Sequence, residues 1–584
     1  MGAMRLLWGS HSESGHGEKK VKFIDMGIDM AGTGLSLRRV PGLALVLAFL
    51  LAHLLSASTS SASATNLYVS QSGTGSGSSC SDTLSAAWFN TAANWGSGSS
   101  QIGPGTTVHL CGTFTGAAGS TMLTVQGSGT SGNPITVKFE SGALLSAPYW
   151  AGAGGGAIKT ASRSYVVIDG GTPCGTSGTC NGVIQNTANG TGLTYQAASY
   201  GIEASGCNNC QYKNLGIYNI YVHTGVGNEI DQTAMQAIHV ANSTNVTIND
   251  CTFHDIGWAI GGIVENYVLY NNYIYNYDHG IAYGVASGSH GTITIHDNHF
   301  GSMAAWDNTA NSYHHDSIHL WGGQPSGTIT GIWIYNNLFD GDPGQNVNAY
   351  VYLEQAVSNA VVFNNVLISP ANRTFPTEIC LGNKGTSVSQ NNQAFNNTIL
   401  GGSYAAGTAL QNSLQSGTTG PAAINNIIQG QNVVINYGNS TDTSTTPCSS
   451  PGGSISGCIL SNVYEDVSAA GGSYNTFGFH GTNGTKLAWW QSALPAGTGK
   501  DAGAQLMLAA AMKLDGGGHP LSGSPVIGAG TNLSALCTGP LVPLCRDKGG
   551  NSRPASGAWD VGAYNSGTST PPPAAPSGLA AVVR

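Results

Sequence analysis

The residues best suited to chemistry lie together in residues 313–321, Tyr-His-His-Asp-Ser-Ile-His-Leu-Trp. Three imidazoles and a carboxylate packed this closely are hard to explain as a solvated loop. Histidine titrates near neutral pH, so it can take or give a proton, and it is also a common metal ligand. We predict that Asp316 and His319 are catalytic, and that His315 and Trp321 contact a substrate.

A second acid and histidine, Asp278 and His279, precede a similar strand one repeat earlier. When the two strands are aligned, His279 falls opposite Asp316, which places both pairs on neighbouring coils of a repeating structure. We therefore add Asp278 and His279 to the predicted catalytic residues. His239, on an earlier copy of the strand, and Asp231, in the loop before it, complete that set.

The repeating element is a short strand that returns at least seven times between Gly201 and Leu381. Each copy has an aliphatic or β-branched residue second, and side chains alternate between the two faces of a strand. Alignment on that residue predicts one outward column, in which neighbouring coils are about 4.8 Å apart. The column consists of Glu203, His239, Gly261, Ala282, His319, Tyr352 and Cys380.

The residues of this column are expected to form the floor of a groove. Gly261 and Ala282 leave room at its centre, and we predict that Glu203, Tyr283 and Tyr352 contact the substrate. The inward column of aliphatic residues is expected to form the core.

A second strand pattern ends in a pair of amides or carboxylates, as in Asn271-Asn272 and Asn336-Asn337. Asparagine tolerates the left-handed conformation of a tight bend and can bond to nearby backbone. Stacked from coil to coil, such side chains can also form an internal hydrogen-bonded ladder. We therefore interpret nearly every asparagine here as structural.

Composition narrows the fold class. The 584 residues include 85 glycines and only 8% charged side chains, and no long stretch has helical periodicity. These features favour an all-β solenoid of many short strands. The net charge of −9 is spread thinly and forms no basic stripe, so nucleic acid is excluded as a partner.

The N-terminal 64 residues carry a basic pair, a short apolar run and a small-residue cleavage site that ends at Ala64. This order is typical of a secretory signal, and the run is too short to span a bilayer. Export agrees with the 12 cysteines, several of which lie close together in sequence. The expected disulfides are Cys174–Cys180, Cys207–Cys210, Cys448–Cys458 and Cys537–Cys545, with Cys251 and Cys380 buried as free thiols.

The succession of Val166-Val167-Ile168-Asp169 and the coils after it resembles the right-handed parallel β-helix proteins of the pectate-lyase-like class. The resemblance covers residues 66–565. We divide them into an N-terminal cap with the first coils (65–165), central coils (166–430) and C-terminal coils with a closing segment (431–565). Residues 566–584 are a proline-rich linker and resemble the start of a fibronectin type III module.

The resemblance implies a secreted, monomeric protein that acts on a polysaccharide. Hydrolysis needs a carboxylic acid and a carboxylate, which Asp316 with Asp231 or Asp278 would supply. β-Elimination from a uronate needs a base and an acid, which His239 or His319 with Tyr283 or Tyr352 would supply. Elimination also needs a cation, and the resemblance leaves room for Ca²⁺, although no set of basic residues lies in the column.

Other interpretations remain open from the sequence. One is a non-catalytic surface or adhesion protein, and another is a uronate C5-epimerase. A transition metal held by His314, His315, Asp316 and His319 is a third. Because an i, i+3 pair on a regular strand does not converge as it does on a helix, we predict no metal ligand here.

Overall fold

The structure, a computed structural model, describes residues 65–566 with several internal segments left out. These segments are residues 175–179, 191, 223–234, 304–313, 324–325, 345–346, 372–376, 383–387, 403–406, 414–420, 431, 438–456 and 471–475. The predicted leader, the C-terminal linker and Asp231 therefore lie outside the described residues. Among the residues that are described, no helix combines the length and apolar composition needed to cross a bilayer.

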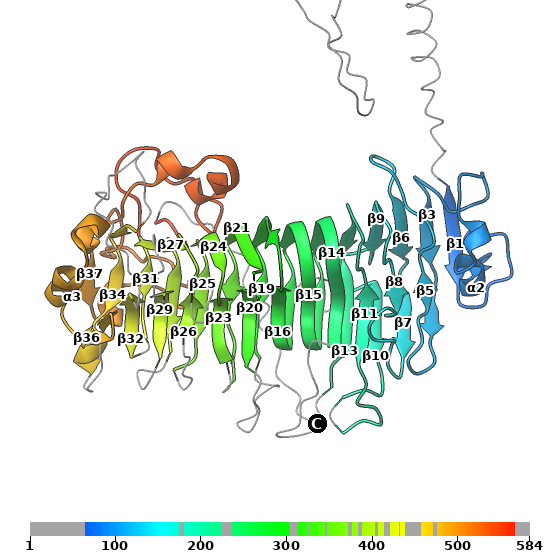
Figure 1. The fold of residues 1–584 in the computed structure, drawn as a ribbon, viewed down its shortest axis with the longest axis horizontal. Helices are drawn as coiled ribbons and strands as arrows, with labels where there is room; N and C mark the ends of the chain where they lie inside the picture. The colour runs from blue at the N-terminus through cyan, green and yellow to red at the C-terminus, as the bar shows by residue number, and fades with distance from the viewer. Residues whose placement is uncertain are drawn as a thin grey trace, which may run out of the picture. The chain divides into compact units, whose positions relative to one another are not determined.

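The chain winds into a right-handed parallel β-helix, as the sequence predicts (Figure 1). Nearly all strand pairs are parallel, because each strand bonds to its counterpart one coil later in the chain. Three strips of strands run along the solenoid. We call them the site face, the second face and the third face.

The site face pairs the strands in the order of the chain. They are β11 (Ser199–Glu203), β14 (Met235–Asn249), β15 (Thr252–Tyr270), β16 (Tyr273–Val285), β20 (His315–Gly322), β23 (Val347–Leu353), β26 (Thr377–Cys380), β29 (Thr408–Ser413), β32 (Val433–Tyr437) and β35 (Phe477–Phe479).

The second face begins with the first coils of the molecule. Its strands are β1 (Asn66–Ser70), β3 (Thr107–Leu110), β6 (Ile135–Phe139), β9 (Val166–Asp169), β12 (Gln211–Lys213), parts of β14 and β15, β18 (Ile293–His296), β21 (Thr328–Tyr335), β24 (Val357–Phe363), β27 (Gln393–Phe395), β30 (Ala422–Ile424) and β33 (Ile459–Leu460). β14 and β16 each continue around a bend and serve two faces, and β15 serves all three.

The third face is the remaining side of each coil. Its strands are β4 (Thr113–Thr115), β7 (Leu144–Ala147), β10 (Gly182–Asn186), β13 (Leu215–Ile220), parts of β15 and β16, β19 (His299–Phe300), β22 (Leu338–Phe339), β25 (Val366–Ser369), β28 (Thr398–Gly401), β31 (Ile427–Ile428), β34 (Val463–Glu465) and β37 (Gln505–Met507).

The remaining elements are short. They are β2 (Leu84–Ser85), α2 (Ala86–Phe89), η1 (Ala92–Asn94), β5 (Leu123–Thr124), β8 (Ile158–Lys159), β17 (Ser289–His290), η5 (Val467–Ala470), β36 (Thr482–Gly484), α3 (Leu487–Ala493), η6 (Ala496–Asp501), η7 (Ala509–Met512), η8 (Ser534–Leu536) and η9 (Gly539–Cys545).

The inward column of the site face forms the core, as expected from the repeat. Its side chains are at most 1% exposed and stack along the solenoid axis: Ile202, Ile238, Ile260, Ile281, Ile318, Val351 and Ile379. Each layer of such aliphatic contacts supports only its neighbours, which is the general logic of a solenoid.

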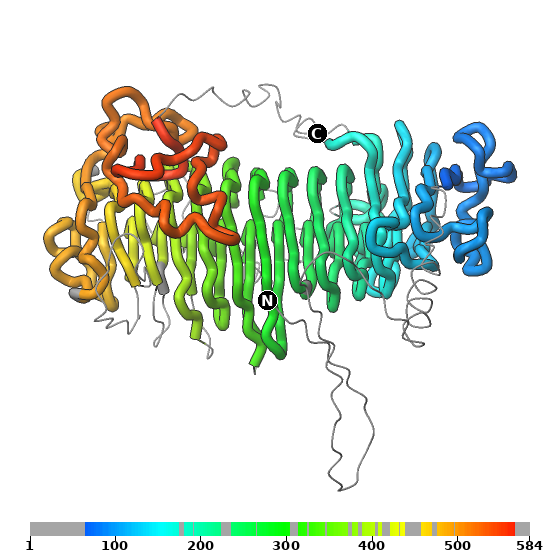
Figure 2. The backbone as a smooth tube through the Cα atoms, turned by 90° about the horizontal axis from the view of Figure 1, so that it is seen from above, coloured from blue at the N-terminus to red at the C-terminus, as the bar shows by residue number. Residues whose placement is uncertain are grey.

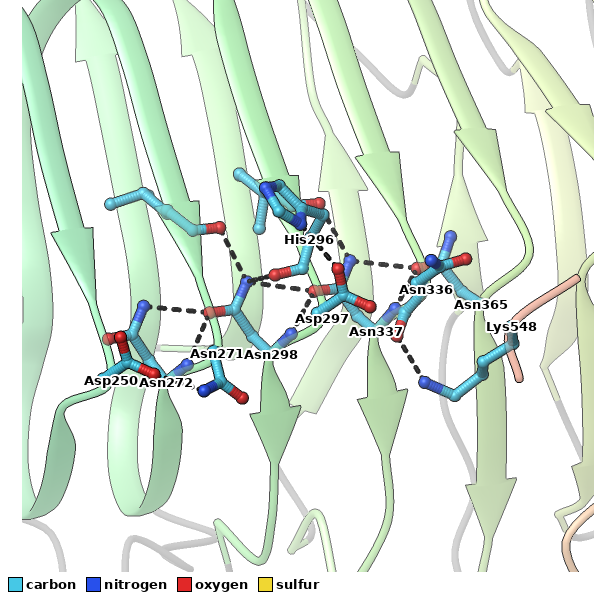
Figure 3. A network of polar contacts seen from close by, with 12 residues as sticks. Asp250, Asn271, Asn272, His296, Asp297, Asn298, Asn336, Asn337, Asn365 and Lys548 are labelled. Carbon is cyan, nitrogen blue, oxygen red and sulfur yellow. Dashed lines mark hydrogen bonds and ion pairs between the residues drawn. The ribbon is translucent and has the colours of Figure 1, made fainter. Parts of the chain in front are cut away.

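The paired asparagines divide two tasks between them (Figure 3). The first member of each pair takes the left-handed bend, with φ of 55° at Asn271 and 56° at Asn336. The second member points inside and bonds to its counterpart one coil later, for example Asn337 Nδ2 to Asn365 Oδ1 at 3.0 Å. The interior ladder runs through Asn272, Asn298, Asn337, Asn365, Asn397, Asn426 and Asn462. The structural interpretation of these residues is confirmed.

Asp501 ends the ladder as a carboxylate that only accepts hydrogen bonds. It receives Asn462 Nδ2 at 3.1 Å and Trp490 Nε1 at 3.0 Å, and Tyr464 donates its hydroxyl as well. Burial raises the pKa of Asp501 to about 6, against the effect of the hydrogen bonds from Tyr464 and Trp490.

After the last coils, the chain turns back along the outside of the solenoid (Figure 2). We call residues 509–566 the return segment. Its Trp559, Leu533 and Leu544 pack on β21, β24, β27 and β30 of the second face. Arg553 is buried, and its guanidinium donates to Asn364 Oδ1 at 2.9 Å and to backbone carbonyls, including that of Asp560.

The disulfides Cys174–Cys180, Cys207–Cys210 and Cys537–Cys545 form as expected. Cys458 is disulfide-bonded too, while its expected partner Cys448 lies outside the described residues. A bond between Cys80 and Cys111, 31 residues apart, was not predicted because neither cysteine has a close neighbour in the sequence. Cys251 and Cys380 are free and buried, as expected.

Candidate functional site

The strand pairing reproduces the outward column inferred from the repeats. Glu203 pairs with His239, His239 with Gly261, Gly261 with Ala282, Ala282 with His319, His319 with Tyr352, and Tyr352 with Cys380. His279 also pairs with Asp316, as the alignment predicts. Side-chain alternation on a strand has a period of two, so fixing the inward aliphatic residue fixes the outward one.

At the centre of the site face lies a group that we call the His–Asp cluster, which consists of His279, His314, Asp316 and His319. One potential ligand atom from each residue lies within 4.8 Å of all the others. His279 Nε2 is 3.5 Å from Asp316 Oδ2 and 3.4 Å from His319 Nδ1. His319 Nδ1 is 3.7 Å from the same Asp316 oxygen, which also bonds to His314 Nδ1 at 2.7 Å.

The convergence of Asp316 and His319 differs from the sequence expectation for an i, i+3 pair on a strand. The pairing between β20 and β23 is irregular there, because Asn348 of β23 is an extra residue between the partners of His315 and Asp316. The Asp316 carboxylate contacts both His319 and His279. Its other oxygen, Oδ1, accepts the backbone N–H of Ala349 at 2.9 Å.

Two further carboxylates each contact one imidazole of the cluster. Asp278 Oδ2 is 2.6 Å from His279 Nδ1, and Glu354 Oε2 is 3.2 Å from His319 Nε2. Asp278 is fully buried, and its second oxygen is 3.5 Å from His315 Nε2. Each of the two central histidines thus has one nitrogen on a supporting carboxylate and the other in the cluster.

The pKa values of the residues in the cluster are shifted in different directions. Burial lowers the pKa of His279, but the charges and hydrogen bonds of Asp278 and Asp316 outweigh it and raise this pKa to about 10. Burial and the neighbouring imidazoles lower the pKa of His319, although Glu354 opposes them. Burial works to raise the pKa of Asp316, yet hydrogen bonds from His279 and His314 hold it well below its usual range.

Aromatic rings surround the cluster. The centroid of the Trp321 ring lies 4.4 Å from that of the His319 ring. The centroid of the Trp258 ring lies 5.4 Å from that of the His279 ring. Both indoles are partly exposed, and they meet edge to face at 6.1 Å. Tyr352 adds a ring 4.8 Å from His319.

Small residues make room for the indoles. A Cβ at Gly284 would lie 2.1 Å from the Trp321 ring, and a Cβ at Gly261 would lie 2.4 Å from Gln236 Oε1 and 2.8 Å from the Trp258 ring. Either approach is closer than real carbon atoms allow. Glycine at these two positions therefore lets the tryptophans lie close against the sheet beside the cluster.

Glu203 and His239 form a separate pair on the same face. His239 Nδ1 is 3.1 Å from Glu203 Oε2, and Ser205 also bonds to this carboxylate. Burial would raise the pKa of Glu203, but His239 and Ser205 lower it to about 2. Four strand spacings separate Glu203 from His319, which is roughly 19 Å, so this pair does not join the cluster.

The remaining predicted residues lie elsewhere. Tyr283 is 1% exposed and packs in the core, because it directly follows the outward Ala282 and so faces the other way. His315 is fully buried beside Asp278, so it supports the cluster from inside.

Two contributing residues were not chosen from the sequence. The sequence offers His314 only as one of four possible metal ligands, and it is not among the predicted catalytic or substrate-contacting residues. Glu354 follows the Tyr352 strand copy directly, and an acid at this position was the signal that could have identified it.

No protein-family model matches the chain, and a search of curated proteins found no match. Solved structures similar to it are parallel β-helix proteins of different activities. A lacto-N-biosidase from Eubacterium ramulus has 12% identity and a TM-score of 0.42, over 76% of this chain and 68% of that one. An exopolygalacturonase from Thermotoga maritima has 12% identity and a TM-score of 0.37, over 57% and 82%. A surface adhesin of Streptococcus pneumoniae has 13% identity and a TM-score of 0.33, over 57% and 83%. The parallel β-helix fold of this chain is given by its own strand pairing, and a fold alone does not determine an activity.

Proposed function

We propose that this protein is an exported enzyme that cleaves a polysaccharide on its site face, by hydrolysis or β-elimination, at the His–Asp cluster. The observation that carries the proposal is the meeting of His279, Asp316 and His319, from two neighbouring coils, within 3.7 Å. Disulfides in the described part of the chain are compatible with export.

The surroundings of the cluster suit a sugar chain. Partly exposed Trp258 and Trp321 offer apolar faces on which sugar rings stack, and the buried Tyr352 ring lies against His319. Glu203 and His239, further along the same face, would contact more distant units of a long substrate. A protein that only bound sugars would need the aromatic surface but would not need the buried acid and imidazoles.

The two reactions use the cluster differently. Hydrolysis needs a carboxylic acid and a carboxylate. Asp316 and Glu354, the carboxylates closest to His319, would supply them. For elimination, His319 would remove a proton and Tyr352 would return one to the leaving group. In the described part of the chain no lysine or arginine pairs with the cluster, so elimination from a uronate would require a bound cation.

One experiment separates these reactions from each other and from binding alone. The purified protein is incubated with a panel of neutral and uronic polysaccharides, while reducing ends and the absorbance of unsaturated ends are both recorded. Reducing ends alone indicate hydrolysis, and both signals together indicate elimination. Absence of new ends with every polysaccharide would contradict the proposal.

The site is tested with two variants and one matched control. We expect Asp316→Asn and His319→Ala to reduce turnover at least 100-fold, since each removes a group from the reacting centre. The control is His296→Ala, which breaks a similar histidine and aspartate pair, 2.6 Å apart, on the second face. Full turnover in both cluster variants would refute the site.

A further inference from the structure

Three atoms of the His–Asp cluster form a triangle that is too wide for good hydrogen bonds. Its sides are 3.4 Å between His279 Nε2 and His319 Nδ1, 3.5 Å between His279 Nε2 and Asp316 Oδ2, and 3.7 Å between His319 Nδ1 and Asp316 Oδ2. Strong hydrogen bonds between such groups are about 2.7–3.0 Å long. By contrast, two ligand atoms bound to one tetrahedral ion at about 2.0–2.2 Å are roughly 3.3–3.6 Å apart.

The carboxylates that contact the two central histidines match the groups that usually support metal ligands. A histidine that binds a metal usually donates its other ring N–H to a carboxylate or carbonyl, which fixes its tautomer and its orientation. Both central histidines have this partner, since Asp278 contacts His279 Nδ1 at 2.6 Å and Glu354 contacts His319 Nε2 at 3.2 Å. The other Asp316 oxygen, Oδ1, accepts the Ala349 N–H, and Oδ2 is the corner of the triangle and also bonds to His314 Nδ1 at 2.7 Å.

The charges of the site also call for a cation. Asp278 and Asp316 are completely buried and Glu354 is partly buried. Across the described residues, none of the three carboxylates pairs with a lysine or an arginine, and imidazoles are their only cationic neighbours. A divalent ion at the centre of the triangle would offset these negative charges where solvent cannot.

We propose that His279 Nε2, His319 Nδ1 and Asp316 Oδ2 bind one divalent transition-metal ion of the Zn²⁺ type. Imidazole-rich sites suit zinc, cobalt, nickel, copper and iron, whereas Ca²⁺ prefers six to eight oxygen ligands. The Ca²⁺ that the fold resemblance allows therefore does not fit this donor set.

Three protein ligands leave a fourth position open, as in catalytic metal sites. His314, whose side chain is 38% exposed, is the most exposed member of the cluster and bonds to Asp316 Oδ2. Metal binding does not require that the proposed function be right. The open position would accept an oxygen of the substrate, and this role rests on the proposed cleavage.

Metal binding is measured directly. The protein is purified without a histidine tag, stripped with a chelator and titrated with Zn²⁺ by calorimetry, and with Co²⁺ by visible absorption. We expect one ion per chain, and intense Co²⁺ bands typical of four-coordinate geometry. Failure of the wild-type protein to bind either ion at micromolar concentration, or displacement of Co²⁺ by millimolar Ca²⁺, would overturn the proposal.

Variants locate the ion. We expect His319→Ala and Asp316→Asn to weaken Zn²⁺ binding at least 100-fold, and Glu354→Gln to weaken it about 10- to 100-fold because it removes a supporting carboxylate. His296→Ala should bind like the wild type. Glu354→Gln changes a partly exposed group, so it remains informative if a buried variant fails to fold. Unchanged affinity in Glu354→Gln and in a folded His319→Ala would place the ion elsewhere and refute the assignment.

These results are distinguishable from those of the cleavage assay. Metal binding without cleavage of any polysaccharide would leave the metal site intact and contradict the proposed function. Cleavage by a wild-type protein that binds no metal would support the function and contradict the metal site.

Discussion

At the residue scale, the cluster shows how a buried carboxylate can gather histidines from different coils. Asp316 belongs to β20 but contacts His279 of β16, and its backbone partner Ala349 belongs to β23. Three consecutive coils therefore meet at one side chain. Replacing this residue affects the geometry of all three.

Gly284 offers a direct test of the aromatic wall. A methyl group at this position would collide with the Trp321 ring, so Gly284→Ala must displace the indole from its place beside His319. We expect KM for the polysaccharide to rise about 10-fold or more, because small displacements of a positioning group are costly. The matched control is Gly516→Ala, where the added methyl group meets no neighbour within 4 Å. Equal KM values for the two variants would show that Trp321 does not contact the substrate.

Asp501 gives a pH-dependent stability. Its pKa is raised to about 6 in the folded protein, compared with about 3.9 in an unfolded chain. The folded state therefore binds the proton more tightly, and this contribution is complete below about pH 4 and is lost as the pH rises through 6. The difference is on the order of 3 kcal/mol.

We expect Asp501→Asn to remove this pH dependence, and to destabilise the protein because the new amide would face the Trp490 N–H donor. Chemical denaturation followed by tryptophan fluorescence between pH 4 and 7 measures both effects. A difference between wild type and variant that does not change with pH would contradict the raised pKa.

At the element scale, the ladder makes each coil depend on the next. Asn337 accepts the backbone and side-chain N–H groups of Asn298, and it donates to Ile295 O and to Asn365 Oδ1. We expect Asn337→Ala to lower the free energy of unfolding by about 2–4 kcal/mol, since it leaves several buried groups without partners. Thr294→Ala, on the neighbouring strand β18, should cost well under half as much. Thermal and denaturant unfolding of both variants provide the comparison.

The repeats allowed the strand register to be predicted because burial selects one residue in each copy. Ile281 and Ile318 must face inward, so Ala282 and His319 must face outward. The same alternation could have placed Tyr283 in the core, and counting the copies could have separated Glu203 from His319. The cluster itself was only partly predictable, because regular alternation along a strand does not bring Asp316 and His319 together. Glu354 directly follows a strand copy, which was a usable signal, whereas Cys80 bonds to Cys111 across 31 residues and no local pattern reveals that contact.

At the scale of the whole molecule, the return segment contacts the second face while the cluster lies on the site face. Trp559 is fully buried between the return segment and the strands beneath it. We expect Trp559→Ala to destabilise the return segment by about 3–5 kcal/mol. Limited proteolysis should then cut within residues 509–566 much faster than in the wild type. Zn²⁺ binding and polysaccharide cleavage should stay unchanged, and a parallel loss of either would show that the segment also shapes the cluster.

The return segment also has a consequence for how the protein is made. Lys548 donates to the carbonyl of Asn336 across 212 residues, and Arg553 reaches Asn364 across 189. Coils can stack in the order in which they leave the ribosome, but these contacts of the return segment form only after Lys548 and Arg553 have emerged, 212 and 189 residues behind their partners. Late-closing contacts of such long range slow folding. Until then the apolar strip of Phe363 and Phe395 stays uncovered, which makes the intermediate without these contacts the stage most exposed to aggregation and to proteases.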